Sequence, residues 1–253
     1  MKAVILAAGY ATRLYPLTLN IPKCLLQVRG KAILESLCEK LAPLREIDEI
    51  LIVTNARFYG QLESWSRSAA SRRDAWAEGA TVRVLNDGSV SNETRLGAAG
   101  DLRFAAREAN LRTDILMLAS DNLFEEGLRD FMDFSLKAKD SVCIGLHDIG
   151  DRSLAAKKFG VVEVDQTFRV TGMEEKPEHP RSSLIGMGIY FLPAKALARL
   201  DEYLASPGAQ DAPGFYIRWL FEKGVEIRSF LFRGMWYDIG DFQALEEANK
   251  RNP

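Results

Sequence analysis

Apolar runs and helical patterns alternate through the first 147 residues of the chain. Strands are predicted over residues 4–6, 47–53, 80–85, 114–119 and 141–147. The first run, Val4-Ile5-Leu6, and the run at 114–119 contain almost no polar positions, as expected of central strands covered on both faces. Helices are predicted between the strands, over residues 32–41, 57–71 and 101–109. This alternation predicts a doubly wound α/β sheet.

The pattern changes after residue 147. Residues 159–165 and 168–173 alternate between apolar and polar positions, which predicts an antiparallel pair of strands. The remaining predicted elements are a strand at 184–192, helices at 194–204 and 214–223, a strand at 225–232 and a helix at 242–250, which Asp241 would cap. We therefore expect one domain over residues 1–253, a Rossmann-like mixed sheet with an inserted antiparallel half at 148–253.

The segment after the first strand has the composition of a phosphate-binding loop. Small residues there let backbone N–H groups approach an anion, and a hydroxyl and two cations follow them. The residues concerned are Leu6, Ala7, Ala8, Gly9, Thr12, Arg13 and Lys23. Pro16 and Pro22 interrupt any helix, so Arg13 and Lys23 are expected on an extended loop from which both could reach one polyphosphate. A surface turn carrying solvated cations is the alternative interpretation.

Two better-known phosphate loops are excluded by spacing. The chain contains no G-x-x-x-x-G-K-[ST], and the single glycine of the loop, Gly9, cannot form a G-x-G-x-x-G turn.

The net charge and the cysteine content argue against several classes of protein. The net charge of −2 offers no basic footprint for nucleic acid, so local cations must hold any anion. The three cysteines lack C-x-x-C spacing, which argues against a disulfide framework or a zinc site. No apolar run approaches the ~18 residues of a membrane span. We expect a cytoplasmic protein that contacts neither nucleic acid nor membrane, and that could form a homo-oligomer.

A carboxylate stands at the end of the predicted strand 114–119. In an open α/β sheet, ligands bind beyond the carboxyl ends of the strands, and Asp121 lies there. A carboxylate in this position is a suitable ligand for Mg²⁺, which a triphosphate requires. The alternative is that Asp121 or Asn122 caps a helix beginning near Glu125.

Several motifs together resemble one enzyme family. Five stretches occur in order between Leu6 and Gly240: LAAGYATRLYPLT, PKCLL, FGVVEVD, EEKP and WYDIG. They resemble the motifs of the sugar-1-phosphate nucleotidylyltransferases, also called nucleotide-sugar pyrophosphorylases, over nearly the whole chain. The chain departs from the family pattern where Ala11 and Ser120 replace glycines and where Met187 replaces an asparagine or threonine.

The resemblance implies roles for individual residues. Residues 1–147 would bind the nucleoside triphosphate and residues 148–253 the sugar phosphate. Asp121 and Asp238 would hold Mg²⁺. Arg13, Lys23, Asp121 and Lys176 would be catalytic; Leu6, Ala7, Ala8, Gly9, Thr12, Arg13, Lys23, Asn92, Gly97 and Asp121 would bind the nucleotide; and Gly160, Glu175, Lys176 and Met187 would bind the sugar phosphate.

The implied reaction joins a nucleoside triphosphate and a sugar 1-phosphate, with release of pyrophosphate. A phosphate monoester is already mostly dianionic at neutral pH, so no general base is needed, and we assign neither His147 nor His179 to catalysis. The runner-up is a cytidylyltransferase for a non-sugar phosphate or phosphonate, such as phosphocholine. A catalytically silent nucleotide-sugar sensor is the alternative from another class. A metal-dependent glycosyltransferase is disfavoured because the chain has no D-x-D.

Overall fold

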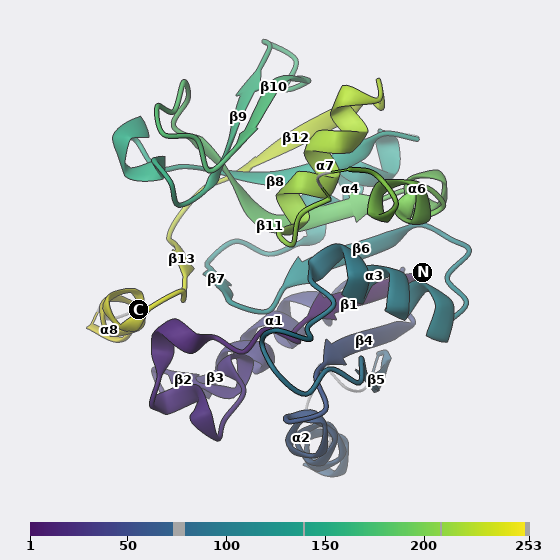
Figure 1. Ribbon diagram of the computed structural model, residues 1–253, viewed down its shortest axis with the longest axis vertical. Helices are drawn as coiled ribbons and strands as arrows, with labels where there is room; N and C mark the ends of the chain where they lie inside the picture. The colour runs from purple at the N-terminus through teal and green to yellow at the C-terminus, as the bar shows by residue number, and fades with distance from the viewer. Residues whose placement is uncertain (73–78, 139, 208, 251–253) are drawn as a thin grey trace.

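A nine-stranded mixed sheet runs through the described part of the chain (Figure 1). The computed structural model describes residues 1–72, 79–138, 140–207 and 209–250. The main strand order is β10-β9-β11-β6-β1-β4-β5, and β8 and β12 extend the sheet from β11. The strands are β1 (Lys2–Leu6), β4 (Glu49–Thr54), β5 (Thr81–Asn86), β6 (Ile115–Ala119), β8 (Val142–Asp148), β9 (Gly160–Val164), β10 (Val170–Glu175), β11 (Leu184–Leu192) and β12 (Ile227–Phe232).

The two halves of the sheet differ in strand direction, as the hydrophobic pattern predicts. Strands β6, β1, β4 and β5 are mutually parallel. Strand β11 is antiparallel to β6, β8 and β9, and β9 pairs antiparallel with β10. The predicted α/β class with a mixed sheet is therefore confirmed. The division of the chain at residue 147 stays a prediction.

Helices cover both faces of the sheet. They are α1 (Ile33–Leu41), α2 (Tyr59–Arg72), α3 (Ala98–Glu108), α4 (Arg129–Lys137), α5 (Ala194–Leu197), α6 (Leu200–Leu204) and α7 (Pro213–Glu222). The last helix, α8 (Phe242–Lys250), packs instead in a separate apolar cluster with Leu14 and Leu26. One core contains Ile5 of β1 with residues of α1, α2 and α4, and the other contains Val4 with residues of α3, α6 and α7. Neighbouring residues of one strand thus enter opposite cores, which explains why the central strands have no polar face.

Two predicted elements differ in the structure. The helix predicted at 194–204 is two short helices, α5 and α6, separated at Ala198 and Arg199. The phosphate loop is not extended but forms three 3₁₀ turns, η1 (Thr12–Leu14), η2 (Leu17–Leu19) and η3 (Lys23–Leu25). Pro16 and Pro22 stand at the N-caps of η2 and η3, where a missing N–H costs no hydrogen bond. Proline there starts new turns instead of preventing them.

Two small antiparallel sheets complete the fold. One joins β2 (Gln27–Val28) to β3 (Lys31–Ala32), and the other joins β7 (Asn122–Phe124) to β13 (Trp236–Asp238). The pairing of β7 with β13 brings the C-terminal segment next to the end of β6. No helix among residues 1–72, 79–138, 140–207 and 209–250 is long and apolar enough to span a bilayer.

We predict that Gly145→Ala destabilises the fold. An added Cβ on β8 would lie 2.9 Å from Phe232 Cε2 and 3.1 Å from Ile189 Cβ, inside a packed core. Overpacking of this kind costs about 1–3 kcal/mol of unfolding free energy, measurable by urea denaturation. Gly186→Ala on the neighbouring β11 is the control, since its nearest new contact is 3.9 Å away. Equal midpoints for the two variants would contradict the packing argument.

Candidate active site

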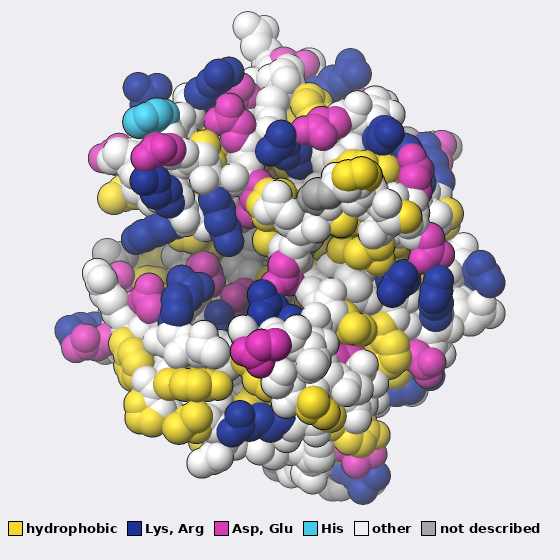
Figure 2. Space-filling model, in the orientation of Figure 1, with side chains coloured by type: hydrophobic (Ala, Val, Ile, Leu, Met, Phe, Trp, Pro, Cys, Tyr) yellow, Lys and Arg dark blue, Asp and Glu magenta, His cyan; other side chains and the backbone are white. Residues whose placement is uncertain are grey.

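A cleft of about 570 Å³ lies where the two halves of the sheet meet. Figure 2 shows it as a hollow on one face of the molecule, with Lys, Arg, Asp and Glu side chains around its edges. Its walls come from the first loop, the end of β6, strands β8 to β11, the start of α7, β13 and α8. The sequence-predicted residues that line it are Arg13, Asp121, Gly160, Glu175, Lys176, Met187 and Asp238.

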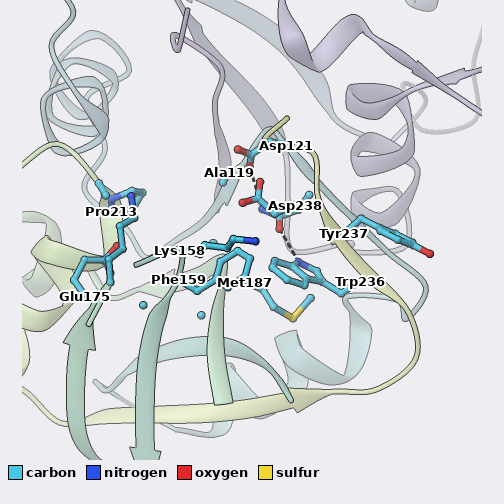
Figure 3. A pocket seen from close by; sticks show the side chains of 18 of the residues that line it. Ala119, Asp121, Lys158, Phe159, Glu175, Met187, Pro213, Trp236, Tyr237 and Asp238 are labelled. Atoms are coloured by element: carbon cyan, nitrogen blue, oxygen red, sulfur yellow. Dashed lines mark hydrogen bonds between the residues drawn. The ribbon is translucent and has the colours of Figure 1, made fainter. Parts of the chain in front are cut away.

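The pairing of β7 with β13 brings the two predicted metal carboxylates together. Asp238 pairs with Asn122 in this ribbon, and the Ile239 N–H donates to the Asp121 carbonyl oxygen at 2.9 Å. The Trp236 indole N–H donates to Asn122 Oδ1 at 2.7 Å, which fixes the ribbon (Figure 3). Asp121 does not cap a helix, because α4 begins only at Arg129. The capping alternative is therefore wrong.

Lys23 is held against this carboxylate pair. Its Nζ donates to Asp121 Oδ2 at 2.8 Å, and both side chains are less than one third exposed, at 15% and 31%. Burial acts to raise the pKa of the Asp121 carboxyl, but the Lys23 ammonium outweighs it and holds that pKa below its usual range. Burial and the adjacent Asp121 carboxylate raise the pKa of Asp238 to about 7. Two carboxylates this close repel each other, and a divalent cation bound between them would relieve that repulsion.

The donor set fits a hard divalent cation that shares its ligands with a substrate. Among the residues that the structure describes, no group of three or more His, Cys, Asp or Glu side chains could hold a metal alone. Mg²⁺ is commonly bound by one or two protein carboxylates together with phosphate oxygens and water. Asp121 and Asp238 would supply the two carboxylates.

The first loop presents Arg13 on the same side of the cleft. A Cβ added to Gly240 would lie 3.4 Å from Arg13 Nη2, and the same position is 3.6 Å from Asp238 Oδ2. The Arg13 guanidinium and the Asp238 carboxylate therefore lie close together. Gly9 is exposed and has open space where a side chain would begin. The Asn55 amide fixes the preceding turn by donating to the Ala8 carbonyl oxygen at 2.9 Å.

Ala11 adopts a left-handed backbone conformation, with φ 47° and ψ 45°. It occupies the position where the resemblance expects glycine, and a residue with a Cβ costs about 1–2 kcal/mol there. The strained residue directly precedes the η1 turn that carries Thr12 and Arg13.

Glu175 lies on the opposite side of the cleft, between two glycines. A Cβ on Gly160 would lie 2.6 Å from Glu175 Oε2, and a Cβ on Gly214 would clash with the same oxygen. Burial raises the pKa of Glu175, while Lys176 acts to lower it. Met187 is fully buried at the cleft wall. Its thioether presents an apolar surface where the resemblance expects an amide or a hydroxyl.

Of the ten predicted nucleotide-binding residues, only Arg13 and Asp121 line this cleft. The other eight lie outside its lining: Leu6, Ala7, Ala8, Gly9, Thr12, Lys23, Asn92 and Gly97. Asn92 and Gly97 line a smaller pocket of about 300 Å³ beside Asp211. The Asp211 carboxylate accepts from the Ala98 N–H at 3.1 Å and pairs with Arg95. It covers Gly97 so closely that a Cβ on this glycine would lie 2.6 Å from Asp211 Oδ1.

The cleft also contains residues that the sequence did not single out. Lys158, Tyr190, Gly214 and Trp236 line it. The Trp236 ring packs edge-on against Phe159, with ring centroids 5.3 Å apart, and at a tilt against His147, with centroids 5.6 Å apart. Trp236 and Phe159 lie within motifs quoted above, so their positions in those motifs could have indicated them. Lys158 precedes such a motif as one of two adjacent lysines, which on its own is typical of a solvated surface.

Comparison with known proteins shows a matching family model and several relatives. A family model described as nucleotidyl transferase matches residues 2–252. The bifunctional protein GlmU of Methanocaldococcus jannaschii is 25% identical over 250 residues, which cover 99% of this chain and 54% of that protein. The glucose-1-phosphate thymidylyltransferase of Streptomyces antibioticus is 28% identical over 259 residues, which cover 99% and 65%. The chain thus spans between about half and two thirds of the length of these relatives.

A solved structure supports the same fold. UDP-glucose pyrophosphorylase complexed with UDP-glucose is similar with a TM-score of 0.81, covering 98% of this chain and 96% of that one. The sequence identity of 21% makes this a likeness of fold.

We predict that Ala11→Gly stabilises the protein. Glycine relieves the left-handed strain but adds freedom to the unfolded chain, so the net gain should be about 0.5–1 kcal/mol in urea denaturation. Ala156→Gly is the control, because Ala156 has an ordinary φ of −53° and its replacement should lower stability. A loss of stability in both variants would contradict the strain at Ala11.

Proposed function

Because the chain belongs to the nucleotidyl transferase family, we propose that it joins a nucleoside triphosphate to a sugar 1-phosphate, forming a nucleoside diphosphate sugar and pyrophosphate. The observation that supports this proposal is that two groups of charged residues lie at one cleft. Lys23, Asp121 and Asp238 form a charged group at one side, and Glu175 and Lys176 line the same cleft. Two phosphorylated ligands could therefore meet within it.

The nucleotide would bind at the first loop. Backbone groups of Leu6, Ala7, Ala8 and Gly9 with the Thr12 hydroxyl would contact its phosphates, and Asn92 and Gly97 would lie toward its base. Arg13 and Lys23 would neutralise the charge that develops on the departing pyrophosphate. The exposed Gly9 and the position of Arg13 beside Asp238 support this assignment.

Asp121 and Asp238 would hold Mg²⁺ together with the triphosphate oxygens. The metal, when bound, supplies charge neutralisation and orientation of the phosphates. In the free protein, Lys23 compensates part of the charge of the carboxylate pair through its contact with Asp121 at 2.8 Å.

The sugar phosphate would bind on the other side of the cleft. Glu175 would accept hydrogen bonds from sugar hydroxyls, Gly160 would allow close approach of the backbone, and Lys176 would bind the phosphate. Met187 would contact an apolar part of the sugar ring. Gly160 and Gly214 make room for the Glu175 carboxylate at the cleft wall, which supports this assignment.

The chemical step needs no proton acceptor. An oxygen of the dianionic acceptor phosphate attacks the α-phosphorus, and the bond from that phosphorus to the α–β bridging oxygen breaks as pyrophosphate leaves. His147 packs against Trp236, burial lowers its pKa, and His179 is exposed. Catalysis would rest on positioning and on charge neutralisation. The cytoplasmic location and a homo-oligomer stay predictions.

A second candidate is a cytidylyltransferase for an amine-bearing phosphate. Aromatic side chains of Phe159, Tyr190 and Trp236 line the cleft together with the Glu175 carboxylate. Aromatic faces and a carboxylate are the groups that bind a quaternary ammonium.

The substrate class and the metal requirement can be tested in one assay. We expect pyrophosphate release with Mg²⁺ for one pair from a matrix of dTTP, UTP, CTP, GTP and ATP against glucose 1-phosphate, mannose 1-phosphate and phosphocholine. EDTA should abolish this release, and added Mg²⁺ should restore it. Release only with CTP and phosphocholine would favour the second candidate. No release with any pair would contradict nucleotidyl transfer.

Removing the charges of Lys23 or Asp121 should slow turnover. We expect Lys23→Ala and Asp121→Ala each to lower kcat by about 10²- to 10³-fold, as loss of one preorganised charged donor typically does. Lys31→Ala is the control, since this exposed lysine pairs with Glu39 outside the cleft. Circular dichroism should show that all three variants are folded. Near-normal turnover of either cleft variant would contradict its assigned role.

A further inference from the structure

Two chain segments at the cleft are joined by reciprocal backbone hydrogen bonds. The Lys157 N–H donates to the Pro177 carbonyl oxygen at 2.9 Å, and the Lys176 N–H donates to the Phe159 carbonyl oxygen at 3.1 Å. These bonds lie directly beyond the paired strands β9 and β10, where Gly160 faces Glu175. They hold the segment that carries Lys158 beside the segment that carries Lys176.

The backbone at this junction is strained. Lys157 and Lys176 have φ angles of 59° and 50°, a left-handed conformation that side chains with a Cβ rarely adopt. Strained residues persist where surrounding contacts fix them, and they are common at binding sites. The two left-handed residues therefore fix the directions in which the neighbouring side chains leave the backbone.

The three lysines at this junction differ in their partners. Lys157 Nζ pairs with Glu178 Oε1 at 2.7 Å, so its charge is compensated. All three lysines line the cleft, but neither Lys158 nor Lys176 has a carboxylate within ion-pair distance among the residues that the structure describes. Figure 3 shows the Lys158 side chain reaching into the pocket, between Glu175 and Trp236, with its ammonium toward Asp238.

Lys158 and Lys176 thus bring two positive charges without ion-pair partners to one cleft, and an anion bound there would be attracted by both. A phosphate dianion carries two charges and several acceptor oxygens, so it can accept from both ammonium groups at once. We propose that Lys158 is a second phosphate-binding residue, which together with Lys176 clamps the phosphate of the acceptor substrate. This inference rests on the proposed function, because it concerns the acceptor of the same reaction.

Steady-state kinetics with the substrate pair identified for the wild type test this assignment. Lys158→Ala should raise the KM for the acceptor phosphate by about tenfold to a hundredfold, the range for loss of one charge-assisted hydrogen bond. The KM for the nucleoside triphosphate should stay within about twofold. Lys158→Arg retains the charge and should recover most of the loss. Lys157→Ala, which removes the neighbouring compensated lysine, should leave both KM values near those of the wild type.

Two kinetic outcomes would overturn the assignment. One is an acceptor KM in Lys158→Ala no higher than in Lys157→Ala, and the other is a rise in KM confined to the nucleoside triphosphate. Melting temperatures of the variants show whether a change in KM reflects a folding defect. A lost contact leaves the melting temperature unchanged and is restored in Lys158→Arg, whereas a folding defect lowers the melting temperature.

Binding of inorganic phosphate, measured by calorimetry, separates this inference from the proposed function. If the wild type turns over no substrate pair, the proposed function fails while the anion site can still be examined. Weaker phosphate binding in Lys158→Ala than in Lys157→Ala would then support the two-lysine site. Equal binding in the wild type and both variants would overturn it.

Discussion

The cleft depends on the pairing of β7 with β13. Each of these strands has three residues, and together they form a sheet separate from the nine-stranded one. Their register sets Asp238 beside Asp121, and the Ile239 N–H fixes the join through the Asp121 carbonyl oxygen. Without this ribbon the C-terminal segment would have no backbone contact with the end of β6, and the second carboxylate would not reach the first.

Repulsion explains why the ribbon needs a cation beside it. Backbone pairing brings Asp121 and Asp238 together regardless of the charge of their side chains. Nearby cations must therefore reduce the repulsion between the two carboxylates. Lys23 does this through Asp121, and Arg13 lies beside Asp238. The net charge of −2 gives no general attraction for phosphate. The affinity of the cleft for anions must therefore come from these few cations and from Lys158 and Lys176.

The sheet could be predicted from the sequence, whereas the contacts that complete the site could not. Long apolar strands such as β6 and β11 carry a pattern because both their faces are buried. Strands β7 and β13 are too short to show any period, and their pairing joins residues far apart in the chain. The 3₁₀ turns were missed because proline starts such turns as readily as it ends helices. Lys158 was missed because the sequence shows only two adjacent lysines. The tertiary structure is needed to show that Lys157 is ion-paired and Lys158 is not.

Substrate specificity is the property least accessible from the sequence, and the surroundings of Glu175 show why. Its carboxylate occupies space that a side chain on Gly160 or Gly214 would fill. Gly160 faces it across a strand pair, but Gly214 approaches from the N-terminus of α7, which packs on β10 through tertiary contacts alone. The position of the Glu175 carboxylate therefore depends on how α7 packs on β10, which no local sequence motif predicts. A motif can point to Glu175 as a candidate ligand-binding residue, but the shape around its carboxylate arises only where α7 meets the sheet.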